Sequence, residues 1–153
     1  MSNLELKVPP VVLVLIAGAL MWTLALAFPG ASFLFPAAKV AGIAFGGLGV
    51  AVALLGVWAF RSAGTTVDPR VPDQSATLVV RGVYRISRNP MYLGFLLVLM
   101  GWGVILGNVP AFALLPAFVF YMNRFQIIPE ERYMNEKFGE AFRQYTRKVR
   151  RWV

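Results

Sequence analysis

The 153-residue chain contains no cysteine and no histidine. Without cysteine it can form no disulfide, and it offers neither a thiolate nucleophile nor a thiolate metal ligand. Without histidine it lacks a common zinc ligand and the most frequent general base, so we expect no metal site. Any chemistry must therefore rest on arginine, carboxylate, tyrosine, asparagine and backbone groups.

Charged residues are also scarce, at 14% of the chain against roughly 25% in soluble domains. Apolar residues make up 58%, and the mean hydropathy is +0.65. Acidic residues are the rarer charged type, with 7 Asp and Glu against 15 Lys and Arg, for a net charge of +8. Because the basic residues flank apolar runs, we interpret them as membrane-facing, and we expect no nucleic-acid partner.

Long apolar runs dominate what is present, and they predict an all-α, multi-pass membrane bundle. The first run is about 20 residues long, whereas a signal-peptide core has roughly 7–15, so we interpret it as a membrane span. We expect four transmembrane helices, at Val8–Phe28, Val40–Phe60, Met91–Gly107 and Val109–Ile128. Residues 1–153 then form one domain: two spans (1–60), a connector (61–90), a helical hairpin (91–128) and a C-terminal helix (129–153).

The distribution of basic residues predicts the topology. The connector contains five arginines and the segment from Arg124 onward contains eight basic residues. The two remaining loops, at 28–38 and around Asn108, contain no charge before Lys39. Basic segments stay on the cytoplasmic side, so we expect both termini there. The lack of a targeting segment other than the spans fits a bacterial cytoplasmic membrane.

The C-terminal segment has aromatic and apolar residues at spacings of three or four, which indicates an amphipathic helix. They are Phe138, Phe142, Tyr145, Val149 and Trp152. We expect this helix to lie on the membrane surface or to fold over the connector.

The polar stretch RNPMYLG opens the third apolar run. Pro90 suits the first turn of a helix, and Ser87 or Asn89 can cap the free N–H groups there. A helix N-terminus beside Arg88 is an anion site, because free N–H donors add to a full positive charge. We interpret Arg85 differently, as reaching toward lipid phosphates.

Two further groups of residues need an explanation. Gly101 and Gly103, inside the third run, indicate close approach by either a helix or a flat ligand, and the sequence leaves both open. Glu130 and Glu131 follow the fourth run. They can complement a helix dipole, pair with Arg88 or Arg124, or accept hydrogen bonds from a ligand's ammonium or hydroxyl groups. Five glycines in the second run (42, 46, 47, 49 and 56) are equally consistent with small-residue filler or with a specific dimer face.

Together these blocks resemble the isoprenylcysteine carboxyl methyltransferase and phospholipid methyltransferase superfamily of integral membrane enzymes. The resemblance covers Gly64 to Val153 and rests on three patterns. They are R-[HN]-P-x-Y-x-G, a G-x-G in the third run, and E-E followed by F-G-x-x-[FY]-x-x-Y. The eukaryotic carboxyl methyltransferases have His where this chain has Asn89, so the chain is more similar to the prokaryotic branch.

The resemblance implies methyl transfer from S-adenosylmethionine (SAM), leaving S-adenosylhomocysteine, to a lipophilic acceptor that arrives from the bilayer. It implies catalytic roles for Arg88, Arg124 and Glu131. It also implies a cofactor site made by Arg88, Asn89, Pro90, Tyr92, Gly94, Gly101, Gly103, Glu130 and Glu131, to which we add Tyr84 as an aromatic partner for the sulfonium. The acceptor stays open: a prenylated cysteine carboxylate, a phospholipid amine or a small thiol. A non-enzymatic, lipid-binding scaffold is the alternative from another class.

Overall fold

The computed structural model describes residues 5–33, 35–64 and 77–153. These residues form a helical bundle in which the one β-type pairing is an isolated bridge between Ser32 and Asn108. The α-helices are α1 (Pro10–Ala27), α2 (Ala38–Ser62), α3 (Pro90–Leu106), α4 (Leu114–Tyr121), α5 (Ile128–Phe138) and α6 (Glu140–Lys148). Short 3-10 turns lie at η1 (Pro29–Ala31), η3 (Gly82–Arg85) and η4 (Pro110–Ala113), and η5 (Met122–Ile127) is a π-helical segment. The all-α prediction is confirmed.

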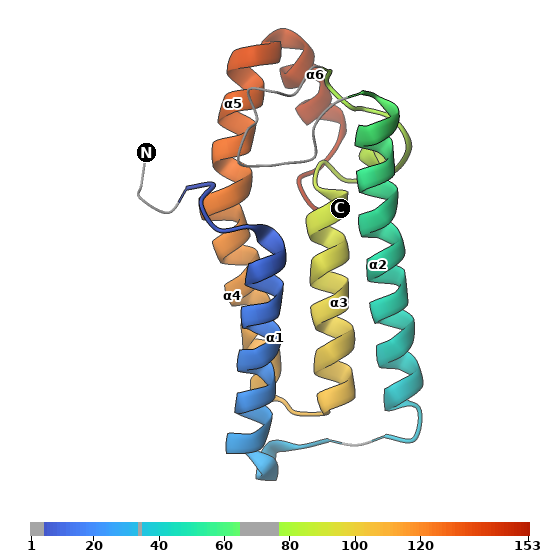
Figure 1. Cartoon of the computed structure of the whole chain (residues 1–153), viewed down its shortest axis with the longest axis vertical. Helices are drawn as coiled ribbons and strands as arrows, with labels where there is room; N and C mark the ends of the chain where they lie inside the picture. The colour runs from blue at the N-terminus through green and yellow to red at the C-terminus, as the bar shows by residue number, and fades with distance from the viewer. Residues whose placement is uncertain (1–4, 34, 65–76) are drawn as a thin grey trace.

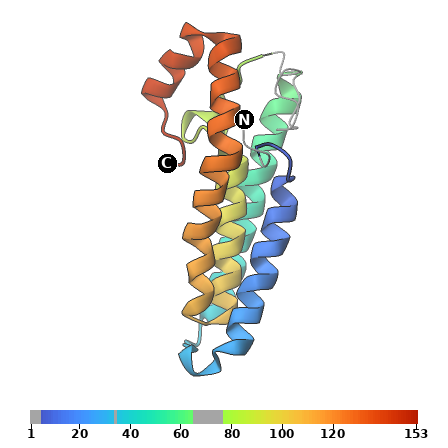
Figure 2. The same cartoon turned by 90° about the vertical axis from the view of Figure 1, so that its left-hand side faces the viewer.

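Helix α3 occupies the centre of the bundle, with α2 on one side and α1 and α4 on the other (Figure 1). The polar ends of the helices meet at one end of the bundle, where α5 and α6 also lie (Figures 1 and 2). The apolar core lies between α1, α3 and α4, and Met21, Leu99 and Met122 are fully buried in it. The polar connection into α3 and the charged C-terminal region therefore share one end of the molecule.

Glycines allow α2 and α3 to pack with their backbones in contact. A Cβ added at Gly94 would lie 2.5 Å from the Gly49 carbonyl oxygen, and one at Gly101 would lie 2.5 Å from the Gly42 carbonyl oxygen. Such distances exclude any side chain unless the helices separate. The glycines of the second apolar run thus provide a packing face within the chain, at Gly42, Gly49 and Gly56, whereas Gly47 faces open space.

The far end of the bundle is closed by the two short loops. Gly107 ends α3 in a left-handed conformation, with φ 56° and ψ 40°. The Asn108 side chain is fully buried and donates from Nδ2 to the Phe28 carbonyl oxygen, at 2.8 Å. Backbone bonds from Phe33 to Gly107 and from Val109 to Ala31 join the same two loops. The predicted tight turn at Asn108 is therefore also a tie to the loop after α1.

The helix from Pro110 to Phe138 continues through Pro129 instead of ending before it. Pro129 has no N–H to donate to the carbonyl of Phe125, four residues earlier. That carbonyl instead accepts the backbone N–H of Leu6, at 3.0 Å, and the helix widens to π geometry just before the proline. Glu130 and Glu131 consequently lie within a continuous helix and do not open a new one after the apolar run.

The region from 129 onward comprises two helices and an extended segment, where the sequence predicted one helix. Gly139, with φ 52° and ψ −122°, ends α5 and allows α6 to fold back (Figure 2). Phe142, Tyr145 and Val149 are buried together against Leu78 of the connector and against Met134 and Phe138 of α5. After Val149 the chain is extended and returns to the start of α3, where Figure 1 marks the C-terminus.

Three helices are long and apolar enough to cross a membrane: Pro10–Ala27, Ala38–Ser62 and Pro110–Phe138. Helix α3 is apolar but has 17 residues, or about 25 Å at the usual rise per residue. Its turns at Gly94 and Gly101 pack on α2, so α3 lies between the longer helices of the bundle. The structure therefore supports a membrane protein and leaves a fourth span as a proposal.

Candidate functional site

A cavity lies at the polar end of the bundle, where the start of α3 faces α5 and α6. Polar and charged side chains of Arg88, Asn89, Glu130 and Glu131 line it, together with Tyr84, Tyr92 and Tyr145. The apolar part of its wall comes from Phe60 at the end of α2, Leu78 and Val79 of the connector, and Met91, Met134 and Phe142. Six of the ten residues expected for the cofactor site therefore line one cavity: five that the resemblance implies, and Tyr84.

Arg88 and Glu131 form an ion pair at the cavity, with 2.9 Å between Nη2 and Oε1. Both side chains are largely buried, at 14% and 20% exposure. Glu131 also accepts two hydrogen bonds from the Arg151 guanidinium. Arg151 Nε donates to Oε1 at 3.1 Å, and Arg151 Nη2 donates to Oε2 at 2.6 Å. These bonds raise the pKa of the Arg151 guanidinium. One carboxylate thus lies between two guanidinium groups, and the trio bears one net positive charge.

Glu130 has different surroundings from its neighbour. Its Oε1 accepts a hydrogen bond from the Tyr92 hydroxyl, at 2.5 Å. That bond joins α3 to α5 across the cavity wall, 38 residues apart in sequence. The sequence did not indicate how the partners of Glu130 and Glu131 differ. In the structure, Glu131 binds the chain's own arginines and Glu130 binds a neutral phenol.

Two tyrosines complete the wall opposite the acidic pair. The Tyr145 hydroxyl donates to the backbone carbonyl of Tyr84, at 2.7 Å. Burial raises the pKa of both phenols well above the ordinary tyrosine value, so both stay neutral at physiological pH. Tyr84 also packs on Phe60, with ring centroids 5.1 Å apart. The cavity consequently presents aromatic surface without negative charge on this side.

The start of α3 differs from the prediction in how its polar side chains are used. Asn89 is the residue before the helix, but its side chain makes no capping bond. Its Nδ2 donates instead to the Arg151 carbonyl, at 2.9 Å, while Ser87 Oγ accepts the Asn89 backbone N–H, at 3.1 Å. The first turn of α3 is therefore left without a side-chain cap, which preserves N–H donors at the positive end of the helix dipole.

The structure does not bring the glycine positions to the cavity. Gly94 and Gly101 contact the backbone of α2, and a Cβ at Gly103 would meet Met21 and Phe112 at 3.0 and 3.1 Å. The sequence predicted close approach by a helix or a flat ligand at Gly101 and Gly103. In the structure α2 approaches Gly101, and core side chains approach Gly103. Pro90 is buried, begins α3 and lies near Gly56 of α2 without lining the cavity.

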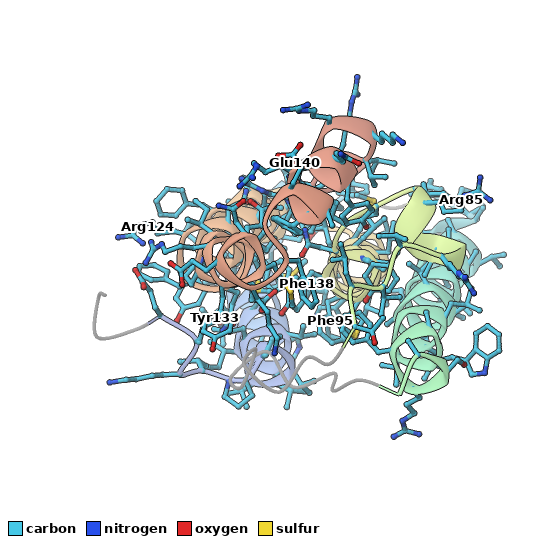
Figure 3. The ribbon with its side chains drawn as sticks, turned by 90° about the horizontal axis from the view of Figure 1, so that it is seen from above. Arg85, Phe95, Arg124, Tyr133, Phe138 and Glu140 are labelled. Carbon is cyan, nitrogen blue, oxygen red and sulfur yellow. The ribbon has the colours of Figure 1, made fainter. Side chains whose placement is uncertain are left out.

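Arg124 lies away from the other site residues. Its guanidinium contacts the Glu5 carboxylate, at 3.1 Å, on the outer side of the bundle. Figure 3 shows Arg124 and Arg85 projecting outward from opposite sides of the molecule. The expected pairing of Arg124 with the acidic pair is absent from the described ion pairs, because the π-helical segment turns Arg124 toward the N-terminal residues.

Sequence reasoning missed several residues of the cavity. Tyr145 and Phe142 had been interpreted only as a packing face, and their spacing gave no indication that they also border polar groups. Arg151 stood in a run of basic residues with no pattern to single it out. Only the fold of α6 over the connector brings these residues to the start of α3.

Comparison with known proteins places this geometry in a family. A profile of the phospholipid methyltransferase family matches residues 37–141, more than half of the chain. An uncharacterized protein of Haemophilus influenzae is 46% identical over 63 residues, which is 41% of this chain and the whole of that protein.

Two relatives have functional names. The protein-S-isoprenylcysteine O-methyltransferase of Schizosaccharomyces pombe is 33% identical over 72 residues, 47% of this chain and 30% of the relative. Protein-S-isoprenylcysteine O-methyltransferase A of Arabidopsis thaliana is 41% identical over 73 residues, 47% of this chain and 36% of the relative. The chain thus spans about a third of the length of these two enzymes. With the profile match from α2 to the start of α6, these likenesses show that the chain belongs to the phospholipid methyltransferase family of membrane methyltransferases.

Proposed function

We propose that the protein is an integral membrane methyltransferase that uses SAM and methylates a lipophilic acceptor. The observation that carries this proposal is the convergence of Arg88, Glu130 and the tyrosines on one cavity at the polar end of the bundle. Those groups come from three separate parts of the sequence. A helix bundle held together only by apolar packing has no need to gather them.

The side chains present fit the chemical groups of SAM. The first turn of α3 and Arg88 suit its carboxylate, because Arg88 Nε is buried and has no hydrogen-bond partner among the described residues. Glu130 suits the ammonium or the ribose hydroxyls. The faces of Tyr84 and Tyr92 suit the sulfonium, in a cation–π contact of roughly 0.5–2 kcal/mol.

The size of the cavity constrains how the cofactor binds. Its free volume is about 90 Å³, below the roughly 300 Å³ at which small-molecule pockets begin. The wall must therefore widen when a whole SAM molecule binds. The connector residues Thr77, Leu78 and Val79 form a part of the wall that belongs to no helix, so we expect the widening there.

When bound, SAM supplies a methyl group activated by a sulfonium. The chain's own contribution is to hold that group in line with the acceptor and to exclude water, which accounts for much of the barrier reduction in such displacements. Phe60 and Met91, at the membrane side of the cavity, supply apolar surface for an acceptor that arrives from the bilayer. A carboxylate or thiolate acceptor is already nucleophilic, which suits a chain without histidine or cysteine.

The acceptor class follows from whether a base is required. An ammonium acceptor, such as a phospholipid amine, must first lose a proton, and Glu130 is the carboxylate placed to accept it. An isoprenylcysteine-type carboxylate needs no such step, and we favour it for that reason. A small thiol is the third acceptor within the same scheme.

The proposed topology places α1, α2, α3 and the Pro110–Phe138 helix across the membrane, with both termini and the cavity on the cytoplasmic side. The described arginines of the connector (Arg61, Arg81, Arg85 and Arg88) and those of the C-terminal region lie at that end. We further propose that α6 lies near the membrane surface of a bacterial cytoplasmic membrane. Reporter fusions at residues 33 and 153 would test the orientation.

The decisive experiment is calorimetric titration of SAM into detergent-purified protein supplemented with lipid. Binding by the wild type that is lost in Glu130→Gln would support the proposed site. Absence of binding by folded wild-type protein would contradict the proposal and favour a lipid-binding scaffold. Labelled SAM with a lipid extract, separated into ester, amine and thioether products, would then identify the acceptor class.

A further inference from the structure

The residues that follow α6 form an extended segment against the start of α3, which we call the C-terminal strap (Arg150–Trp152). The Arg150 carbonyl accepts the Arg88 backbone N–H, at 3.0 Å. The Arg151 carbonyl accepts from Asn89 Nδ2, at 2.9 Å, and from Ser87 Oγ, at 3.4 Å. The strap therefore holds both the backbone and a side chain of the residues that lead into α3.

The far end of the strap is anchored separately. Trp152 Nε1 donates to Asn123 Oδ1, at 3.1 Å, and the indole packs on the apolar core of the bundle. Arg151 thus lies between two fixed points, one on α3 and one on η5. Its backbone is therefore held close to Glu131, which its guanidinium contacts with two hydrogen bonds.

The contact between Arg151 and Glu131 has a consequence for Arg88. Arg151 occupies Glu131 with two hydrogen bonds, at 3.1 and 2.6 Å, and shares Oε1 with Arg88. Arg88 is held to Glu131 through Nη2, while its Nε is buried without an acceptor. Two guanidinium groups against one carboxylate leave an excess positive charge, which favours an anion beside Arg88.

We propose that Arg151 is a positioning residue: through Glu131 it fixes the guanidinium of Arg88 to receive the carboxylate of the cofactor. This inference rests on the proposed SAM site and assigns a function to the C-terminal strap within it. Glu131 then has a role other than that of a direct ligand. It orients Arg88, while Glu130 is the acid that faces the bound molecule.

The test compares two ligands that differ only in the carboxylate that Arg88 is proposed to bind. SAM and decarboxylated SAM share the sulfonium, ammonium and adenosine, but only SAM has the carboxylate. The affinity ratio of the two, measured by calorimetry on the full chain, reports the anion subsite. A merely structural contribution of Arg151 would weaken both ligands equally and leave the ratio unchanged.

We expect Arg151→Ala to lower the preference for SAM by about tenfold or more, as for loss of a charge-assisted contact network. Decarboxylated SAM should keep its wild-type affinity within about twofold. Arg151→Lys retains the positive charge but loses the planar, two-pronged geometry of the guanidinium. Its preference for SAM should therefore fall between those of the wild type and Arg151→Ala. Arg150→Ala is the matched control, because Arg150 is exposed and adjacent and makes its contact to Arg88 through the backbone.

The outcomes separate the two proposals. If wild-type protein binds SAM and Arg151→Ala or Arg151→Lys keeps the full preference for it, the positioning role is wrong and the proposed function stands. An equal loss for both ligands also overturns the positioning role and leaves the C-terminal strap as a structural element. If folded wild-type protein binds neither ligand, the proposed function itself fails and this inference fails with it. Should Arg151→Ala not fold, the Arg151→Lys ratio decides.

Discussion

The two halves of α3 use similar sequence patterns for different purposes. The first turn and the residues before it, Arg88 to Tyr92, face a cavity and make polar contacts with α5 and with the C-terminal strap. The later turns, from Gly94 to Gly103, face α2 and the apolar core, and Trp102 Nε1 donates to the Gly18 carbonyl of α1 at 3.0 Å. A motif that looks continuous in sequence is therefore divided into a polar end, which we propose as the binding end, and a packing end.

The physical reason lies in what each residue can offer at its position. Glycine has no side chain to interact with a ligand, but in an apolar environment it allows two helix backbones to touch. Arginine and tyrosine cannot be buried without partners, so they gather at the end of the helix where polar groups from other elements arrive. Substitutions at the two ends should accordingly affect different measurements, binding at one end and stability at the other.

The largest expected effect on binding is from Arg88→Ala. Removal of a buried charged partner typically costs about 2–5 kcal/mol, so SAM affinity should fall by roughly 30-fold or more. Calorimetry measures the SAM affinity of the variant, and circular dichroism in detergent tests whether its helices persist. Arg85→Ala is the control, because Arg85 is exposed and lies outside the cavity. Equal losses in the two variants would indicate a general effect of surface charge.

At the packing end, Gly101→Ala should lower thermal stability and leave the SAM affinity of the folded protein unchanged. A Cβ there would lie 2.5 Å from the Gly42 carbonyl oxygen, and forcing helices apart costs about 1–3 kcal/mol. Gly47→Ala serves for comparison, since its Cβ would meet open space. Thermal unfolding in detergent measures the stability of the two variants and distinguishes them. Loss of SAM binding without loss of stability would break the division between the two ends.

A smaller effect is expected where the binding end contacts α5. Tyr92→Phe removes the donor to Glu130, and a typical hydrogen bond contributes about 0.5–1.5 kcal/mol. Part of that free energy should appear as weaker SAM binding, by roughly three- to tenfold. A double-mutant cycle with Glu130→Gln measures the coupling. Additive effects would show that Tyr92 and Glu130 act on the ligand independently.

The smallest effect is expected from Arg124→Ala. Its side chain is 45% exposed, pairs with Glu5 and lies outside the cavity. Both SAM affinity and initial methylation rate should stay within about twofold of the wild type. A steady-state assay with the identified acceptor provides the measurement. A large fall in rate would restore the catalytic role that the resemblance implied for Arg124.

Much of the cavity was predictable from residues close in sequence. Arg88, Asn89 and Tyr92 adjoin a proline that begins a helix, and Glu130 and Glu131 follow the next apolar helix back to the same end of the bundle. Helix geometry alone brings these groups together, because an antiparallel hairpin returns the chain to its starting level. The division of labour between Glu130 and Glu131 was not predictable, since neighbouring residues on a helix point in different directions.

The sequence by itself determined the all-helical class, the proline that begins α3, and the polar end at which function should lie. Apolar run length, proline and charge distribution act locally, so they can be interpreted without knowing the neighbours. Tertiary structure alone decided that the glycines of α3 pack on α2, that Arg124 turns to Glu5, and that Arg151 reaches Glu131. Those outcomes depend on contacts between residues 20 to 119 positions apart, and nothing in a local pattern specifies which pairs will meet.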